Sequence, residues 1–138
     1  MHTDELREIR LCETVPRDRH AEVAEFADRI TVPAGKVLIR QGELADEFFM
    51  ILDGVADVIR DNRLVAVLGP GDFFGEIELV GQPCRIATVA AGSELELAVV
   101  PRREFRKLLR RFPDLAAVVL SAARKRVASP PRPAVALS

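Results

Sequence analysis

The sequence predicts a mainly β domain, an antiparallel β jelly-roll barrel (double-stranded β-helix) with an N-terminal helix and a C-terminal helix pair. About eight short strand-like runs lie between residues 30 and 100, and turn signals separate them about every eight to twelve positions. Apolar residues follow a helical spacing on both sides of this region. A chain of 138 residues fits one such domain, here residues 1–128, followed by a proline-rich tail at 129–138 that we expect to be disordered.

The first element is a helical segment, predicted over residues 4–29. Val23, Ala24, Ala27 and Ile30 recur at spacings that place them on one helix face.

The β-roll follows at residues 30–100. Pro33 and Gly35 form a turn between two β-rich runs, and the pairs DG and DN and the stretch GPGD separate the next ones. The run FFMIL is apolar throughout and suits a strand that is buried on both faces, whereas VADVI alternates. The stretch ATVAAGSELELAVV adds two strands around Gly92.

Two helices are predicted over residues 101–127. Their apolar residues fall at i, i+3, i+4 and i+7 on each side of Pro113, which suits the first turn of a new helix. These residues are Phe105, Leu108, Leu109 and Phe112, then Leu115, Val118, Val119 and Ala122.

Composition excludes several classes of protein. No run of eighteen apolar residues exists, so no membrane contact is expected, and the charged N-terminus MHTDELREIR does not resemble a signal peptide. Cys12 and Cys84 are far apart and suggest two free thiols in a reduced, cytoplasmic protein. His2 and His20 both precede the β region, so a metal-binding barrel enzyme lacks its ligands and no metal site is predicted. No nucleophile–base pair is apparent either, and we predict that the chain is not an enzyme.

Charge is divided unevenly along the chain. Residues 1–100 carry a net charge of −9, whereas residues 101–138 carry +8. The basic run comprises Arg102, Arg103, Arg106, Lys107, Arg110 and Arg111. A solvated helix face explains this run, and the acidic β body, in the same chain or across a dimer, is an alternative partner. Nucleic acid is not expected, because no helix-turn-helix reader follows the last helix.

One short loop carries the chemistry. In FFGEIELVGQPCRIATVAA, Gly75 allows the backbone to approach a ligand closely, and residues 76–79 suit a single helical turn with free amides. The guanidinium of Arg85 matches a phosphate, and the carboxylate of Glu76 accepts a hydrogen bond from a hydroxyl. Together these groups fit a sugar phosphate.

This loop resembles the phosphate-binding cassette of the cyclic nucleotide-binding domains, the family of the cAMP receptor and of protein kinase A regulatory subunits. The family pattern, approximately F-G-E-x-A-L and then R-x-A-T-V, is matched at residues 74–79 and 85–89, and the resemblance covers roughly residues 20–127. It implies that Glu76 holds the ribose 2′-hydroxyl and that Arg85 clamps the exocyclic phosphate oxygens. The backbone amides of Ile77, Glu78 and Ala87 would complete the anion cage.

The cassette departs from the pattern at three positions. Glu78 replaces a small residue, and if its carboxylate faced the phosphate at about 5 Å, repulsion would be about 3 kcal/mol at an effective dielectric of about 20. Alternatively, Glu78 is turned to solvent. Ile86 stands where a small or hydroxyl residue is usual, and Cys84 replaces a proline.

Two functions follow from this resemblance. The first is a sensor of a cyclic nucleotide with no further cofactor. We favour cAMP as its ligand because Ile86 offers no hydroxyl to a guanine. Binding would shift a population through hinges near Pro101 and Phe112, and the C-terminal helix would contact a second copy or an effector. The alternative is a ligand-free adaptor in which Glu78 and Ile86 record a lost site.

Overall fold

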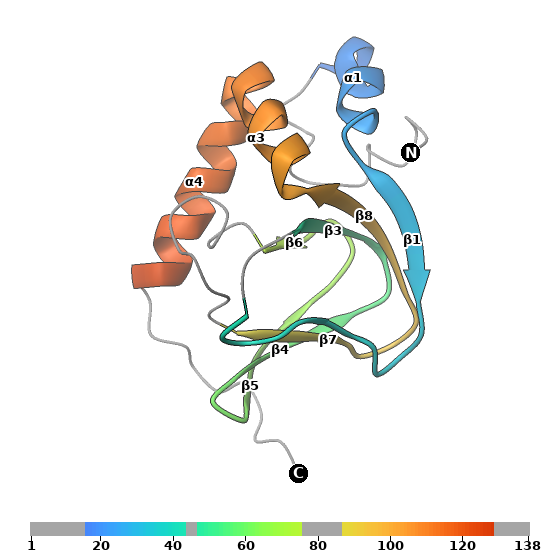
Figure 1. Ribbon diagram of the computed structural model, residues 1–138, viewed down its shortest axis with the longest axis vertical. Coiled ribbons are helices and arrows are strands. Elements are labelled where there is room, and N and C mark those ends of the chain that lie inside the picture. The colour runs from blue at the N-terminus through green and yellow to red at the C-terminus, as the bar shows by residue number, and fades with distance from the viewer. Residues whose placement is uncertain (1–15, 44–46, 76–86, 129–138) are drawn as a thin grey trace.

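The computed structural model describes residues 16–43, 47–75 and 87–128 of the chain. Two four-stranded antiparallel sheets face each other, and the helices cover the outer side of one of them (Figure 1). We call the sheet with the order β1-β8-β3-β6 the helix-side sheet and the one with the order β2-β7-β4-β5 the outer sheet. The strands are β1 (Asp28–Val32), β2 (Val37–Ile39), β3 (Glu47–Asp53), β4 (Ala56–Arg60), β5 (Arg63–Leu68), β6 (Phe73–Phe74), β7 (Thr88–Ala91) and β8 (Leu95–Pro101).

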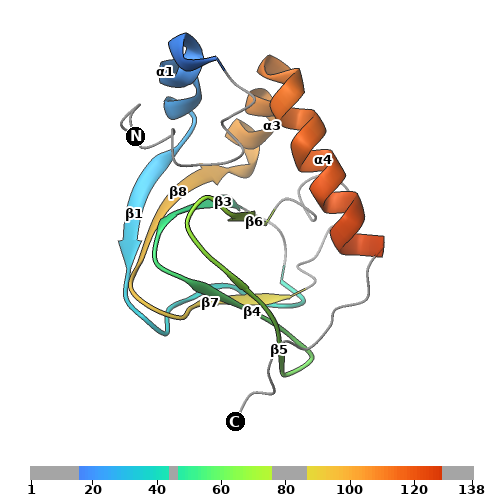
Figure 2. The same cartoon turned by 180° about the vertical axis from the view of Figure 1, so that it is seen from behind.

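The predicted fold class is confirmed, with one refinement. Within the described residues the strands form two separate sheets that pack face to face, rather than one closed barrel. Figure 2 shows the same layers from behind, with the helices on one side of the helix-side sheet and the outer sheet on the other.

Strand β3 is buried on both faces, as its uninterrupted apolar sequence predicts. Phe48, Met50 and Leu52 belong to the core beneath the helices. Phe49 and Ile51 belong to the core between the two sheets. Successive side chains point to opposite faces of a strand, so only a strand covered on both sides can be apolar throughout.

Strand β8 repeats this arrangement beside β3. Leu95, Leu97 and Val99 lie in the core between the sheets, whereas Ala98 and Val100 lie beneath the helices. Burial of a large aliphatic side chain contributes about 1.5–3 kcal/mol, so the β3–β8 pair is a large source of stability.

The helices pack through the apolar positions that periodicity indicates. They are η3 (Arg17–Arg19), α1 (His20–Ala24), α3 (Arg102–Arg111) and α4 (Pro113–Ala128). Phe105, Leu108, Phe112, Leu115 and Val119 are all buried beneath them. Pro113 begins α4, as predicted, because the first turn of a helix does not need its missing N–H.

The predicted first helix extends too far at its C-terminal end, to residue 29. Helix α1 stops at Ala24, and β1 begins at Asp28. Ile30, which helical spacing grouped with Val23, Ala24 and Ala27, instead pairs with Leu97 of β8 and is 36% exposed. Pairing with β8 therefore outweighs the local helical spacing. Residues 1–15 and the predicted tail at 129–138 lie outside the described residues.

No helix in the described part of the chain is both long and apolar enough to cross a bilayer.

Gly54 lies in the turn between β3 and β4, which contacts the turn between β7 and β8. Its φ is +90°, and a β-carbon there would clash with the backbone oxygen of Glu94. The neighbouring N–H of Val55 donates to the hydroxyl of Ser93 at 3.0 Å, and the N–H of Gly92 donates to the carbonyl of Val55 at 2.9 Å. The β3–β4 turn is therefore seated directly on the β7–β8 turn.

We expect Gly54→Ala to lower the free energy of unfolding by about 3 kcal/mol, through left-handed strain plus the clash with Glu94. Gly35→Ala is the matched control, because Gly35 has a φ of +87° but nothing within 4 Å of an added β-carbon. Its loss should be about 1 kcal/mol. Urea denaturation measures both variants. Equal losses of unfolding free energy would contradict the close contact between Gly54 and Glu94.

Candidate functional site

The predicted cassette begins at the end of β6. Phe73 and Phe74 pair with Met50 and Phe49 of β3, and the rings of Phe74 and Phe49 stack at 4.8 Å. Gly75 follows directly and is buried, with a φ of +89° that favours glycine. The chain therefore leaves the helix-side sheet through a turn that a side chain at position 75 would strain.

The cassette ends at the start of β7, in the outer sheet. Ala87 is half-buried and precedes Thr88, whose hydroxyl accepts a hydrogen bond from the backbone N–H of Gln41 at 3.0 Å. The side-chain amide of Gln41 exchanges two hydrogen bonds with Asp61, of 2.9 and 3.1 Å. Strand β7, which follows the cassette, is thus hydrogen-bonded to the loop after β2. That loop is in turn hydrogen-bonded to the β4–β5 turn.

The two ends of the predicted site therefore lie on different sheets. Of the predicted residues, Gly75 and Ala87 are within the described part of the chain, one on each side of the loop. The others lie outside the described residues; they are Glu76, Ile77, Glu78, Arg85 and Ile86. No group of three or more His, Cys, Asp or Glu side chains suited to a metal ion occurs among the described residues.

Comparison with models of protein families identifies the family of this chain. The model of the cyclic nucleotide-binding domain matches residues 29–112, which contain both sheets except Asp28, the whole cassette and α3. The chain belongs to this family. The resemblance seen in the sequence is thereby confirmed, and the family description is that of a binding domain.

Known relatives of this cyclic nucleotide-binding domain are regulatory subunits and channels. The chain is 32% identical over 111 residues to the cAMP-dependent protein kinase regulatory subunit of Schizosaccharomyces pombe, covering 80% of this chain and 27% of that protein. It is 37% identical over 101 residues to a cyclic nucleotide-gated potassium channel of Rhizobium etli, covering 73% of this chain and 28% of the channel. The chain thus spans about a quarter of the length of these curated relatives.

Solved structures agree with this assignment. A cAMP-bound structure of PfPKA-R superposes with a TM-score of 0.79 at 26% identity, over 91% of this chain and 44% of that one. The catabolite activator protein of Thermus thermophilus superposes with a TM-score of 0.77 at 26% identity, over 85% of this chain and 57% of that one.

Three stacked or tilted rings connect β6 of this domain to α3. Phe73 of β6 lies 5.7 Å from Phe48 of β3, and Phe48 stacks on Phe105 of α3 at 4.5 Å. We call these three residues the aromatic path. The path starts two residues before Gly75 and ends on the first helix after the β-roll. Sequence reasoning placed Phe105 in the core but gave no signal for its contact with Phe48.

A second connection joins α1 to the α3–α4 junction. The carboxylate of Glu22 accepts a hydrogen bond of 2.8 Å from Nε of Arg111 and one of 3.4 Å from Arg19. The guanidinium of Arg19 also lies over the ring of Phe112, 4.6 Å from its centroid. We call Glu22, Arg19 and Arg111 the junction cluster. Through Arg19 the cluster contacts Phe112, the residue between α3 and α4.

The junction cluster makes stability depend on pH. The hydrogen bond from Arg111, followed by that from Arg19, lowers the pKa of the Glu22 carboxyl below its usual value. A group whose pKa is lower in the folded state stabilises the fold above its unfolded pKa, and this stabilisation is lost as pH falls through the folded value.

Glu22→Gln should therefore lower the thermal midpoint at about pH 7, and the difference from wild type should shrink below about pH 4. Differential scanning fluorimetry across this range measures it. Glu94→Gln is the control, because Glu94 is exposed and has no ion pair with any residue of the described ranges. A constant difference between Glu22→Gln and wild type at all pH values would refute the assigned role of the charge.

Proposed function

We propose that the chain binds cAMP in the cassette, between Gly75 and Ala87, and transmits the bound state to α3 and α4. The observation that carries this proposal is the family match over residues 29–112, which includes every predicted ligand-binding residue. The positions of Gly75 and Ala87 at the ends of two facing sheets support it, because a loop between them can close over a small ligand.

Each cassette residue has a chemical role in this proposal. Arg85 donates to the exocyclic phosphate oxygens in the bidentate geometry that its planar guanidinium favours. Glu76 accepts from the ribose 2′-hydroxyl, away from the phosphate charge. The backbone amides of Ile77, Glu78 and Ala87 complete the anion cage, and the side chain of Glu78 turns to solvent because it would otherwise oppose the phosphate.

The choice of cAMP rests on Ile86 and on the relatives. An isoleucine side chain offers no hydroxyl that could bond a guanine. The Schizosaccharomyces pombe relative is named as a cAMP-dependent kinase subunit, and the PfPKA-R structure contains cAMP.

The output would run through the aromatic path. A shift of β6 on ligand binding would move Phe73 against Phe48. The ring of Phe48 stacks on that of Phe105 of α3, with 4.5 Å between the ring centroids. Close-packed rings transmit displacement because they leave no space to absorb it. Movement of α3 would reach α4, where Val118 and Leu120 are 37% and 38% exposed and offer apolar contacts to a second copy or an effector.

Saturating cAMP should raise the thermal midpoint of the chain by several degrees, since ligand at a hundred times its Kd stabilises by about 2.7 kcal/mol. Thermal shift with cAMP, cGMP and a cyclic dinucleotide tests both binding and ligand choice. Arg85→Ala should abolish the response, whereas the exposed outer-sheet residue Arg63, changed to Ala, should leave it intact.

If none of the three nucleotides raises the thermal midpoint of the wild type, the adaptor alternative is favoured. In that alternative the residues at positions 78 and 86 have abolished the binding site. The double variant Glu78→Ala/Ile86→Ala then discriminates further. A response regained by this variant assigns the loss to those two side chains, and continued silence removes the proposed site altogether.

Phe73→Leu should weaken the transmission while leaving the affinity for cAMP within about threefold, because the ring contact with Phe48 is lost but the cassette residues remain. Hydrogen exchange of the α3 and α4 amides, with and without cAMP, measures transmission. Phe26→Leu is the control, since Phe26 packs against the same core but has no ring contact in the described residues. A full α3 response in Phe73→Leu would eliminate the aromatic path.

A further inference from the structure

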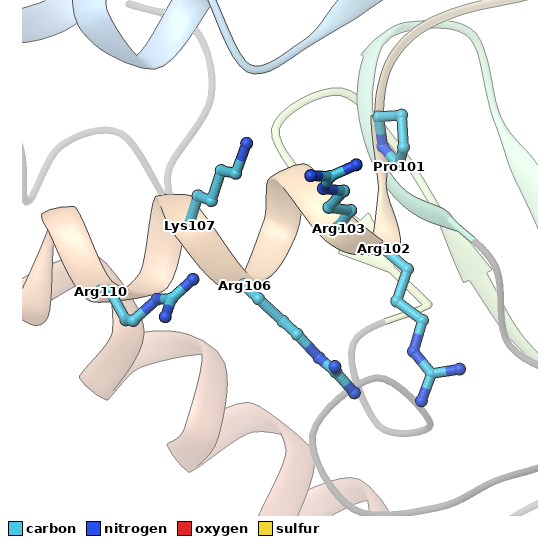
Figure 3. A pocket seen from close by; sticks show the side chains of 6 residues that line it. All are labelled: Pro101, Arg102, Arg103, Arg106, Lys107 and Arg110. Carbon is cyan, nitrogen blue, oxygen red and sulfur yellow. The ribbon is translucent and has the colours of Figure 1, made fainter.

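The face of α3 that points away from the core forms a basic hollow. A pocket of about 810 Å³ is lined by six described residues, Pro101, Arg102, Arg103, Arg106, Lys107 and Arg110. We call it the basic groove. All five cationic residues are exposed, and Figure 3 shows Arg102 and Arg106 extending in the same direction from the helix.

Most of this positive charge is not neutralised by the described part of the chain. Lys107 pairs with Glu104 at 3.3 Å, but the four arginines of the groove have no ion pair with any described residue. Arg111, next along the helix, shows the contrast, because it pairs with Glu22 at 2.8 Å. Like charges gathered around a hollow repel one another, so an anionic occupant lowers their electrostatic energy.

We propose that the basic groove binds an acidic protein segment rich in Asp or Glu. The lining cations extend over nine positions of one helix, from residue 102 to 110, or about 12 Å. About four residues of an extended chain cover this length. Arginine pairs with carboxylates through two parallel N–H···O bonds, which gives such a segment both affinity and a defined register.

Charge over the rest of the molecule favours a short acidic segment over nucleic acid. A duplex extends far beyond a groove of about 12 Å, and residues 1–100 carry a net charge of −9 that would repel its phosphates. The described lining also contains no aromatic side chain on which an unpaired base could stack. A short segment can remain within the groove. This proposal does not depend on the binding of a cyclic nucleotide.

Fluorescence anisotropy with a labelled peptide of alternating Glu and Ser, about eight residues long, tests the groove. The wild type should bind it at about 50 mM salt and release it as salt is raised to about 0.3 M. Arg106→Glu/Arg110→Glu should weaken binding by about tenfold or more. Arg106→Lys/Arg110→Lys, which keeps the charge but loses the paired N–H···O bonds, should weaken it by about threefold.

Lys36→Glu/Arg63→Glu is the matched control, because both residues are exposed on the β side and the change in net charge is the same. It should alter peptide binding by less than about twofold. An equal loss in the two charge-reversed variants would reduce the effect to net charge and overturn the proposal. So would an absence of peptide binding at low salt, tighter binding of a duplex oligonucleotide at the same salt, or equal binding of a Gln-for-Glu peptide.

Discussion

The burial of strands β3 and β8 on both faces is the constraint on which the rest of this domain depends. In β3 and β8 the apolar side chains alternate between the core between the sheets and the core beneath the helices, whereas Glu96 of β8 is half-buried and pairs with Arg29 of β1. A register slip by one residue would exchange these two sets, so that Phe48 and Phe49 would each meet the wrong partner. The register is therefore fixed from both sides. Because β6 pairs with β3 and α3 follows directly from β8, the same register sets the positions of both.

This arrangement gives the predicted ligand loop and the helices different attachments. The loop is held at one end by the helix-side sheet, after Phe74, and at the other by the outer sheet, before Thr88. Among the described residues, the buried side chains of the helices belong to the core on the helix-side sheet. In the proposed mechanism, a ligand in the loop would act on β6, a strand of only two residues, rather than on the longer strands beside it. Phe73 lies on this short strand and meets Phe48, whose ring stacks on Phe105. The shortest strand of the sheet is thus linked to α3 through the ring of Phe48 on β3.

The sequence predicts those features that local chemistry decides. The continuous apolar run FFMIL requires a strand covered on two sides, the turn glycines separate the strands, and strong periodicity around Pro113 indicates both C-terminal helices. The end of α1 was missed because the pairing of Ile30 with Leu97, 67 positions away, overrides helical spacing. The contact of Glu22 with Arg111 and the ring contacts of Phe48 were missed for the same reason, since they arise only once distant elements are packed. For the site, the cassette motif indicates the family from residue types alone. The positive φ of Gly75 agrees with it, while the positions of Glu76 and Arg85 fall outside the described residues.

Helix α3 has two faces, and each of the two proposals uses one of them. Phe105 and Leu108 face the core, where the aromatic path ends, and the arginines of the basic groove face outward. A helix of ten residues moves as one body, so a displacement caused at Phe105 would also move the arginines of the groove relative to Pro101 and the sheet. If the nucleotide favours one position of α3 and the acidic segment favours one as well, the two ligands share a single equilibrium. Thermodynamic linkage then requires that each changes the affinity for the other by the same factor. The division of charge along this chain would in that case serve regulation, because the acidic residues 1–100 would repel an acidic partner that the basic groove attracts.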